Sequence, residues 1–398
     1  MILEMERALF DELARNGDLT GPQIALIARD AREWRASAVD VLIARGFVEE
    51  QRLAQATAAA CGLKVFGDEL SGFDARLALF ADRDFFVRHR LIPYSRVNGR
   101  TLIAAVNPYT VLPALSAELG EEPFELCIIT RPAMTKALML AFGHDIVDDS
   151  STALSRLHPE LSARGGLWTW QIVFLVGIGG AVIWAGVNWP DIVLKIAAGI
   201  GGAFFIAVTL FRLLAVLVGA WPKRKLRLPA ISSLDELPTV TLLVALYDEA
   251  DMVRETVHYL GRIDYPWTKL DILLLLEEDD LKTRAACESL PLDGRFTILT
   301  VPNGKPRTKP KACNFGLKFA RGDIIALYDA EDRPDPLQVR EAAAHLAAGD
   351  ARLACLQARL NFYNARENWL TSQFALEFAI WFQFILPGLE RLRLPIPL

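Results

Sequence analysis

Acidic side chains follow an apolar run near the end of the sequence, in GDIIALYDAEDRPDP (residues 322–336). We expect residues 324–328 to form a buried strand that ends at three carboxylates, Asp329, Glu331 and Asp332. Carboxylates at positions i and i+2 of an irregular loop can share one hard cation, which then binds a diphosphate. Because a D-x-E-D pattern by itself is more often a solvated acidic turn, the metal-site interpretation depends on what lies beside it.

Polar residues also follow two earlier apolar runs. Tyr247–Glu249 comes directly after residues 239–246, and Glu277–Asp280 comes after residues 272–276. Open parallel sheets bind ligands at the carboxyl ends of their strands. We therefore expect the three polar clusters to meet at one edge of a sheet and to form a single site there.

A basic stretch, KPRTKPK, occupies residues 305–311 and leads into a predicted helix that starts at Pro310. Cationic side chains near a helix N-terminus suit a pyrophosphate, and Lys309 and Lys311 are the candidates. Judged by itself, the stretch is equally well explained as a solvated basic loop.

Apolar strand-like runs alternate with helical segments from residue 239 onward. Strands are predicted at 239–246, 272–276, 296–301, 323–328 and 352–357, and helices at 249–260, 310–320 and 336–348. The strands are apolar on both faces, which predicts an α/β fold with a mostly parallel sheet covered on two sides.

Two long apolar segments lie before this region. Residues 165–190 contain no charged residue, and Leu167–Val187 is long enough to cross a membrane as a helix. The second segment, Ile192–Trp221, contains Lys195 and Arg212. A mid-membrane charge is expensive, so the simplest interpretation ends the span before Arg212, and a tilted span that reaches Trp221 is the alternative. Small residues would let the two helices pack closely: Gly177, Gly180, Gly199, Gly202 and Ala203.

Charge predicts how this hairpin is oriented. Four basic residues lie within residues 223–227, directly after the second span, and the positive-inside rule places them in the cytoplasm. Since two spans return the chain to the same side, we expect both flanking regions in the cytoplasm. The net charge of −5 gives no reason to expect a nucleic-acid partner. The five single cysteines favour a reducing compartment.

Five motifs in order make the last third of the chain resemble the donor half of family 2 glycosyltransferases, which have the GT-A fold and include cellulose-synthase-like enzymes. The motifs are PTVTLLVALYDEAD at Pro238–Asp251, EEDD at Glu277–Asp280, KPKACN at Lys309–Asn314, DAED at Asp329–Asp332, and Gln357 after the last predicted strand. This resemblance implies an inverting transfer of sugar from a UDP-sugar to a growing exopolysaccharide at a bacterial inner membrane.

The resemblance also implies a role for each motif. The residues implied in donor binding are Tyr247, Glu249, Glu277, Glu278 and Gln357, with Lys309 and Lys311 on the pyrophosphate. Asp329, Glu331 and Asp332 would bind Mg²⁺ or Mn²⁺, with the choice between Glu331 and Asp332 open. Implied partners are the donor, a polysaccharide acceptor, membrane lipid and components for export or secretion.

The sequence departs from the family pattern in two ways. Asp248 stands in place of an Asn, Ala245 in place of a Pro, and Glu331 in place of the second Asp of D-x-D. The family's later acidic motif, which supplies the catalytic base, and its Q/R-x-x-R-W segment do not occur before Leu398. We therefore expect the base beyond Leu398, and expect residues 369–389 to form an amphipathic helix at the membrane surface.

Residues 1–150 resemble the N-terminal domain of type II secretion and pilus-assembly ATPases. Two helical pieces share an L-x-x-x-G core, in which Gly17 and Gly46 are expected to end helices, and a small α+β region follows. Some relatives bind cyclic di-GMP through R-L-G motifs, but the corresponding positions are Ala8–Phe10 and Ser37–Val39 here. We favour a structural or docking domain over a sensor.

These observations divide the chain into six parts. They are the N-terminal domain (1–150), a linker (151–166), the membrane hairpin (167–221), a basic juxtamembrane linker (222–237), the donor-binding domain (238–365) and an interfacial helix with the chain end (366–398). The alternatives to an enzyme are a scaffold or surface-complex subunit with a degenerate transferase domain, and a regulator that responds to cyclic di-GMP.

The predicted orientation can be tested by labelling intact cells with a membrane-impermeant maleimide. We expect Asp191→Cys, in the short turn between the spans, to react without permeabilisation, because the turn faces away from the cytoplasm. Ser162→Cys, which precedes the first span, is the control and should react only after permeabilisation. The reverse pattern would contradict the orientation.

Overall fold

The computed structural model describes residues 2–67, 69–80, 83–119, 123–162, 164, 166–221, 234–349 and 352–396. The chain divides into two compact units. One unit combines Met1–Glu160 with Pro229–Ala348, and the other combines Leu161–Leu228 with Gly349–Leu398.

A four-stranded parallel sheet forms the centre of the predicted donor-binding domain. Its strands are β5 (Val240–Leu246), β6 (Leu270–Glu277), β7 (Phe296–Val301) and β8 (Ile324–Tyr328), in the spatial order β7-β6-β5-β8. Every pairing is parallel, and β6 is buried along its whole length. The predicted α/β fold with a mostly parallel sheet is confirmed.

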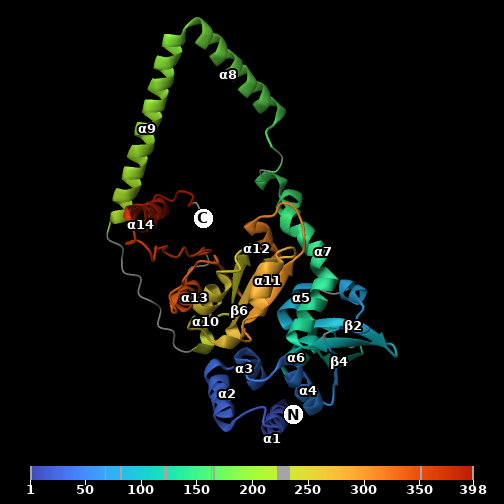
Figure 1. Ribbon diagram of the computed structural model, residues 1–398. Helices are drawn as coiled ribbons and strands as arrows, with labels where there is room; N and C mark the ends of the chain where they lie inside the picture. The colour runs from blue at the N-terminus through green and yellow to red at the C-terminus, as the bar shows by residue number, and fades with distance from the viewer. Residues whose placement is uncertain are drawn as a thin grey trace. The chain divides into compact units, whose positions relative to one another are not determined.

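Helices cover both faces of this sheet (Figure 1). Alternate residues of each strand point to opposite faces. Leu243, Leu273 and Leu275 pack with Phe315 of α12 (Lys309–Leu317), whereas the other face packs against α10 (Val253–Gly261), α11 (Leu281–Glu288) and α13 (Gln338–Ala348). A Cβ atom on Gly316 would come within 2.8 Å of both Cδ atoms of Leu275, so this glycine lets α12 approach the sheet closely.

The predicted fifth strand at 352–357 is wrong. Residues 352–362 are irregular, and they fall in the other compact unit. Leu353 and Leu356 are 38% and 39% exposed, so this apolar run does not form a buried strand. A strand also needs a neighbour for its backbone hydrogen bonds, and this segment pairs with none of the described strands.

The N-terminal domain begins with four helices and continues into a second sheet. The helices are α1 (Ile2–Arg15), α2 (Gly21–Trp34), α3 (Ala38–Arg45) and α4 (Glu50–Cys61). Gly17 and Gly46 have φ angles of +76° and +62° after α1 and α3, so their predicted role as helix-ending residues is confirmed. Ser37 caps α3 by accepting a hydrogen bond from the Asp40 amide at 3.0 Å.

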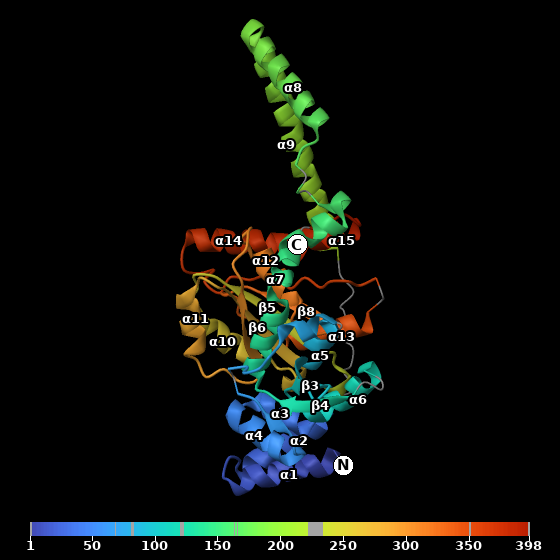
Figure 2. The same cartoon turned by 90° about the vertical axis from the view of Figure 1, so that its right-hand side faces the viewer.

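The second sheet has the order β1-β4-β3-β2. Its strands are β1 (Lys64–Val65), β2 (Leu91–Val97), β3 (Arg100–Ala105) and β4 (Phe124–Ile128), accompanied by η1 (Ala75–Phe80), α5 (Arg83–His89) and α6 (Pro108–Leu119). Figure 2 shows this sheet between the four N-terminal helices and the β5–β8 sheet. The predicted small α+β region is therefore present.

Helix α7 (Arg131–Leu157) joins the N-terminal domain to the β5–β8 sheet, within one compact unit. It runs past residue 150 and packs along α12, where the Asn314 side-chain amide donates a hydrogen bond to the Ser150 carbonyl at 3.0 Å. Residues 151–157 form the last part of this helix. The two parts that the sequence divides into separate domains share one core.

The other compact unit contains two helices that are long and apolar enough to cross a membrane, α8 (Thr169–Asn188) and α9 (Pro190–Ala220). Helix α9 continues through Arg212 to Ala220 without a break. Whether the span ends before Arg212 or reaches Trp221 stays a prediction. The basic cluster at 223–227, which carries the orientation argument, lies outside the described residues.

The expected close packing of α8 on α9 through small residues is wrong. The two helices diverge from their connecting turn (Figure 1). A Cβ atom built on Gly177, Gly180, Gly199 or Gly202 meets no atom within 4 Å. Trp184 and Trp189 pack edge to face beside the turn instead, with ring centroids 5.1 Å apart.

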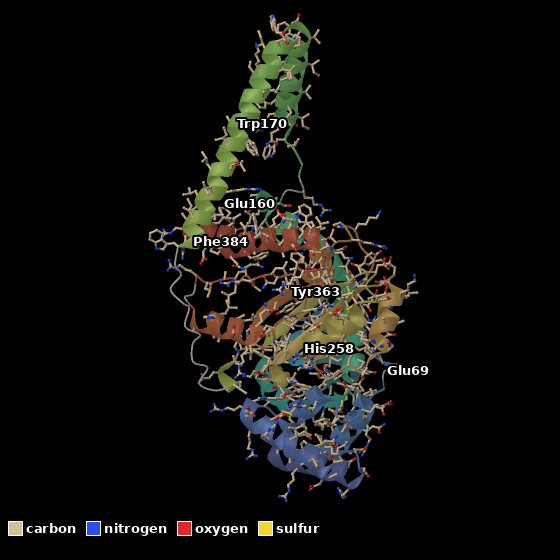
Figure 3. All side chains as sticks on the ribbon, turned by 60° about the vertical axis from the view of Figure 1, so that its left-hand side comes forward. Glu69, Glu160, Trp170, His258, Tyr363 and Phe384 are labelled. Carbon is tan, nitrogen blue, oxygen red and sulfur yellow. The ribbon has the colours of Figure 1, made fainter. Side chains whose placement is uncertain are left out.

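Helix α9 makes its close contact at its other end. The segment predicted as an interfacial helix is helical, with α14 (Trp369–Ile380), a π-turn η6 (Trp381–Ile385) and α15 (Leu386–Arg391). A Cβ atom on Gly219 would overlap the Phe384 carbonyl oxygen, and one on Gly388 would overlap that of Ala215. Figure 3 labels Phe384 at this junction. The Arg391 guanidinium donates hydrogen bonds to the carbonyls of Val218 and Trp221 at 2.6 and 2.9 Å.

This contact predicts opposite effects for the same substitution at two glycines of α9. In an open helix, glycine to alanine favours the helix by about 1 kcal/mol. We expect that gain for Gly199→Ala, whereas Gly219→Ala forces α15 away from α9. Hydrogen exchange of residues 386–391 in the detergent-solubilised protein should therefore accelerate in Gly219→Ala and stay unchanged in Gly199→Ala. Equal exchange in the two variants would contradict the packing.

Candidate active site

Polar side chains meet at the carboxyl ends of β5 and β6, as predicted. The Asp248 amide donates a hydrogen bond to Oδ2 of Asp280 at 2.6 Å, and the Glu249 amide donates one to Oγ1 of Thr283 at 3.1 Å. Asp248 has a φ angle of +57°, a left-handed conformation that Asn and Asp adopt more readily than other non-glycine residues. Aspartate can therefore replace the family's asparagine at this turn.

Asp280 joins the turn after β5 to the start of α11 through its carboxylate. Its Oδ1 also accepts a hydrogen bond from the Thr283 amide at 3.1 Å, which caps α11. Burial raises the pKa of Asp280, but the hydrogen bonds from Thr283 and the Asp248 amide outweigh it, so the pKa lies below its ordinary value. An ionised Asp280 thus fixes the turn after β5.

A buried ion pair ties the end of β6 to the first turn of α12. Nζ of Lys311 lies 2.8 Å from Oε2 of Glu277, and the two side chains are 1% and 8% exposed. Lys311 also donates a hydrogen bond to the Gly304 carbonyl at 3.4 Å, and its amide donates one to Oγ1 of Thr308 at 3.4 Å. In this geometry neither charged group faces the solvent.

Lys309 and the acidic residues after β8 form the exposed part of the site. Lys309 forms an ion pair with Asp329, and both side chains are about half exposed. Asp332 turns back to accept a hydrogen bond from the Asp329 amide at 2.7 Å. Burial, followed by the charges of Asp329 and Glu331, raises the pKa of Asp332. Of the three predicted metal ligands, Asp329 and Glu331 are the exposed ones.

The described residues include no cluster of three His, Cys, Asp or Glu side chains that could enclose a metal ion. Magnesium is commonly held by one or two carboxylates together with substrate phosphates and water, so a protein cage is not required. Burial and then the negative charge of Glu331, with that of Asp248, raise the pKa of Glu249. The negative potential here and the exposed Asp329 fit a divalent cation that arrives with a diphosphate.

The remaining predicted donor residues lie in different places. Tyr247 follows β5 directly and is 56% exposed. Glu278 accepts a hydrogen bond from the Asn303 amide at 3.0 Å, in the loop after β7. Gln357 belongs to the other compact unit, where its side-chain amide donates to the Ala358 carbonyl at 3.2 Å. The first compact unit therefore brings together the predicted site residues except Gln357.

Sequence analysis missed three residues of this edge. Asp280 and Thr283 hold the backbone after β5, and Arg307 pairs with Asp279 at 2.6 Å. The acidic run at Glu277–Asp280 indicates the region, but no local pattern shows which of its carboxylates faces the backbone. Arg307 lies within the basic stretch, where no local pattern distinguishes it from the lysines.

The fold is an α/β domain whose polar side chains gather where its parallel strands end. Residues 241–396 match the sequence model of glycosyl transferase family 2, and this match contains all the polar strand ends. The chain therefore carries a family 2 glycosyltransferase domain, as the resemblance implied.

Curated relatives are similar to part of the chain. "Probable glycosyltransferase YdaM" of Bacillus subtilis is 25% identical over 158 residues, which are 39% of this chain and 37% of that protein. The UDP-forming cellulose synthase catalytic subunit of Komagataeibacter sucrofermentans is 27% identical over 172 residues, or 42% and 22% of the two chains. That of Komagataeibacter xylinus is 28% identical over 144 residues, or 36% and 18%. The chain thus spans well under half the length of these relatives.

Three solved structures are similar to parts of the chain. MshE with cdg is 21% identical, with a TM-score of 0.30, over 33% of this chain and 97% of that one. The N-terminal domain of XpsE is 18% identical, with a TM-score of 0.27, over 34% and 94%. The mannosyltransferase PcManGT of Pyrobaculum calidifontis, in complex with GDP-Man and Mn²⁺, is 26% identical, with a TM-score of 0.33, over 43% and 49%.

The buried ion pair predicts a specific pattern of stability. Removing one partner leaves the other charge buried, so Lys311→Met should lower the free energy of unfolding by about 3–5 kcal/mol. The double variant Glu277→Gln/Lys311→Met removes both charges and should recover part of this loss. Lys305→Met, at an exposed lysine, is the control. Denaturation of the solubilised protein measures these differences, and a Lys311→Met variant as stable as the wild type would refute the pair's role.

Proposed function

We propose that this protein is a membrane-bound, metal-dependent, inverting glycosyltransferase that transfers a sugar from a UDP-sugar to a growing exopolysaccharide. The observation that carries the proposal is the pairing of Lys309 with Asp329 at the exposed end of β8, within a family 2 domain. One cationic and one anionic group at this point suit a diphosphate and its metal ion. The relatives named UDP-forming cellulose synthase subunits favour UDP as the leaving group.

In the proposed donor complex, Lys309 exchanges its bond to Asp329 for the diphosphate. Asp329 and Glu331 would then be free to hold Mg²⁺ or Mn²⁺, which neutralises charge on the departing diphosphate. Lys309 lies in the first turn of α12, where the helix dipole also favours an anion. Tyr247 and Glu249, after β5, are the proposed contacts for the nucleoside.

Lys311 and Glu277 take a positioning role in this proposal, in place of the direct donor contacts inferred from the resemblance. Their ion pair fixes the start of α12 relative to β6, and their charged atoms are buried. Asp280 does the same for the turn that carries Tyr247 and Glu249. Asp332 supports the backbone of Asp329, which leaves Glu331 as the proposed second metal ligand.

The membrane helices support a lipid-bound enzyme whose donor site faces the cytoplasm, where nucleotide sugars are made. Helices α8 and α9 expose large apolar side chains along their lengths, and the described part of both is almost free of burial. A polysaccharide acceptor and export components would be the partners at the membrane.

Release of UDP by membranes that contain the protein tests this function. With Mg²⁺ or Mn²⁺ and a panel of UDP-sugars, the wild type should release UDP, and Asp329→Asn should lower the rate about tenfold or more because a charged ligand is lost. Asp323→Asn, at the opposite end of β8, is the matched control. It should retain the rate, since Asp323 accepts a hydrogen bond from the Thr239 amide at 3.3 Å and lies away from the polar strand ends. Equal rates in Asp329→Asn and the wild type would contradict the proposal.

A further inference from the structure

Helix α7 connects the N-terminal domain with the segment that carries Lys309, within one compact unit (Figure 1). It packs on η1 and β2 of the N-terminal domain, and also on β7 and α12. At its first residue, Nε of Arg131 donates a hydrogen bond to Glu50 of α4 at 2.5 Å. A displacement of the N-terminal domain would therefore carry α7 with it.

Two contacts of α7 reach the neighbourhood of Lys309. The first is the hydrogen bond from the Asn314 side-chain amide of α12 to the Ser150 carbonyl, at 3.0 Å. The second involves the loop at residues 302–308, which joins β7 to α12. A Cβ atom on Gly304 of this loop would lie 2.9 Å from Cγ1 of Val147, so the glycine lets the loop lie directly against α7.

Val147 is a rigid surface for this loop. Its side chain is 9% exposed and belongs to the core that the two domains share. A β-branched side chain in a helix keeps one strongly preferred rotamer, so Val147 cannot turn aside to make room. The position of the loop therefore depends on the position of α7.

The acidic run after β6 holds the same loop from the sheet. Glu278 accepts a hydrogen bond from the Asn303 amide at 3.0 Å, and Asp279 pairs with Arg307 at 2.6 Å. The loop at residues 302–308 is thus attached to the β5–β8 sheet by charged groups and to the N-terminal domain by close packing.

Lys309 directly follows this loop and begins α12. Its ammonium group pairs with Asp329, so the loop and the start of α12 determine how it meets the end of β8. The contacts at Val147 and Ser150 involve a methyl group and a backbone carbonyl, neither of which carries a charge. They can affect a bound diphosphate only through the position of Lys309.

We propose that the N-terminal domain controls the affinity of the donor site through α7, with Gly304 and Asn314 as positioning residues for Lys309. This inference rests on the proposed function, in which Lys309 binds the diphosphate of the donor. A ligand or partner that shifts the N-terminal domain would then change the donor affinity without touching the donor site.

Two substitutions that compensate each other test this coupling. Gly304→Ala adds a methyl group that pushes the loop away from Val147, and the backbone of Gly304 is outside the left-handed region, so alanine fits it otherwise. We expect the dissociation constant of UDP with Mn²⁺, measured by calorimetry on the solubilised full-length protein, to rise about fivefold or more. Val147→Ala removes the opposing methyl group, so the double variant should recover most of the affinity.

Asn314→Ala tests the second contact, and it should raise the same dissociation constant about threefold or more because one hydrogen bond is lost. Asn314 is exposed, so the variant should fold. Tyr265→Phe is the matched control. It also removes one hydrogen bond from a side chain to a carbonyl, that of Pro238 at 2.5 Å, but before β5 and away from Lys309, so it should leave the affinity unchanged.

The results separate this inference from the proposed function. A wild type that binds no UDP would refute the proposed function, and the inference with it. Equal affinity in the wild type, Gly304→Ala and Asn314→Ala would overturn the inference alone. So would a double variant that binds UDP no more tightly than Gly304→Ala, because a general loss of stability would not be relieved by a second truncation.

Discussion

The ion pair between Lys311 and Glu277 is the interaction on which the candidate active site depends. It joins the first turn of α12 to the end of β6 in a place that water does not reach. With that turn fixed, Lys309 is held two residues away, beside Asp329 at the end of β8. The backbone of the same helix packs closely on the sheet at Gly316. The buried Lys311–Glu277 ion pair thereby supports the exposed ion pair between Lys309 and Asp329.

The N-terminal domain contributes to the same arrangement. Its last helix, α7, packs along α12 and accepts a hydrogen bond from Asn314 at Ser150, so α12 lies between the sheet and α7. At the other end of the strands, Gly294 donates its amide proton to the Ala44 carbonyl at 3.1 Å, and Arg131 donates a hydrogen bond back to the Gly294 carbonyl. Both ends of the sheet are thus in contact with this domain. A substitution that breaks either contact would shift α12 or the strands that carry the site residues.

Local patterns in the sequence were enough to predict the sheet and its polar edge. Buried parallel strands such as β6 are continuously apolar, and the charges that follow them are conspicuous. Pairings between distant residues could not be predicted in this way. Nothing in the basic stretch shows that Lys309 is exposed while Lys311 is buried two residues later, because that depends on where β6 ends. The false strand at 352–357 and the shared core of the two domains have the same cause, since both depend on which segments meet in space.

The proposed donor site is anionic, so it should receive a nucleoside diphosphate only together with a divalent cation. Without the cation, the diphosphate would meet Asp329, Glu331 and Glu249 with Lys309 as its main counter-charge, and like charges would repel. Calorimetric titration of UDP into the solubilised protein tests this directly, once with Mn²⁺ and once with a chelator. We expect saturable binding of UDP with Mn²⁺ that is lost in the chelator. Equal affinity in the two conditions would show that the proposed metal ligands do not hold a cation with the diphosphate.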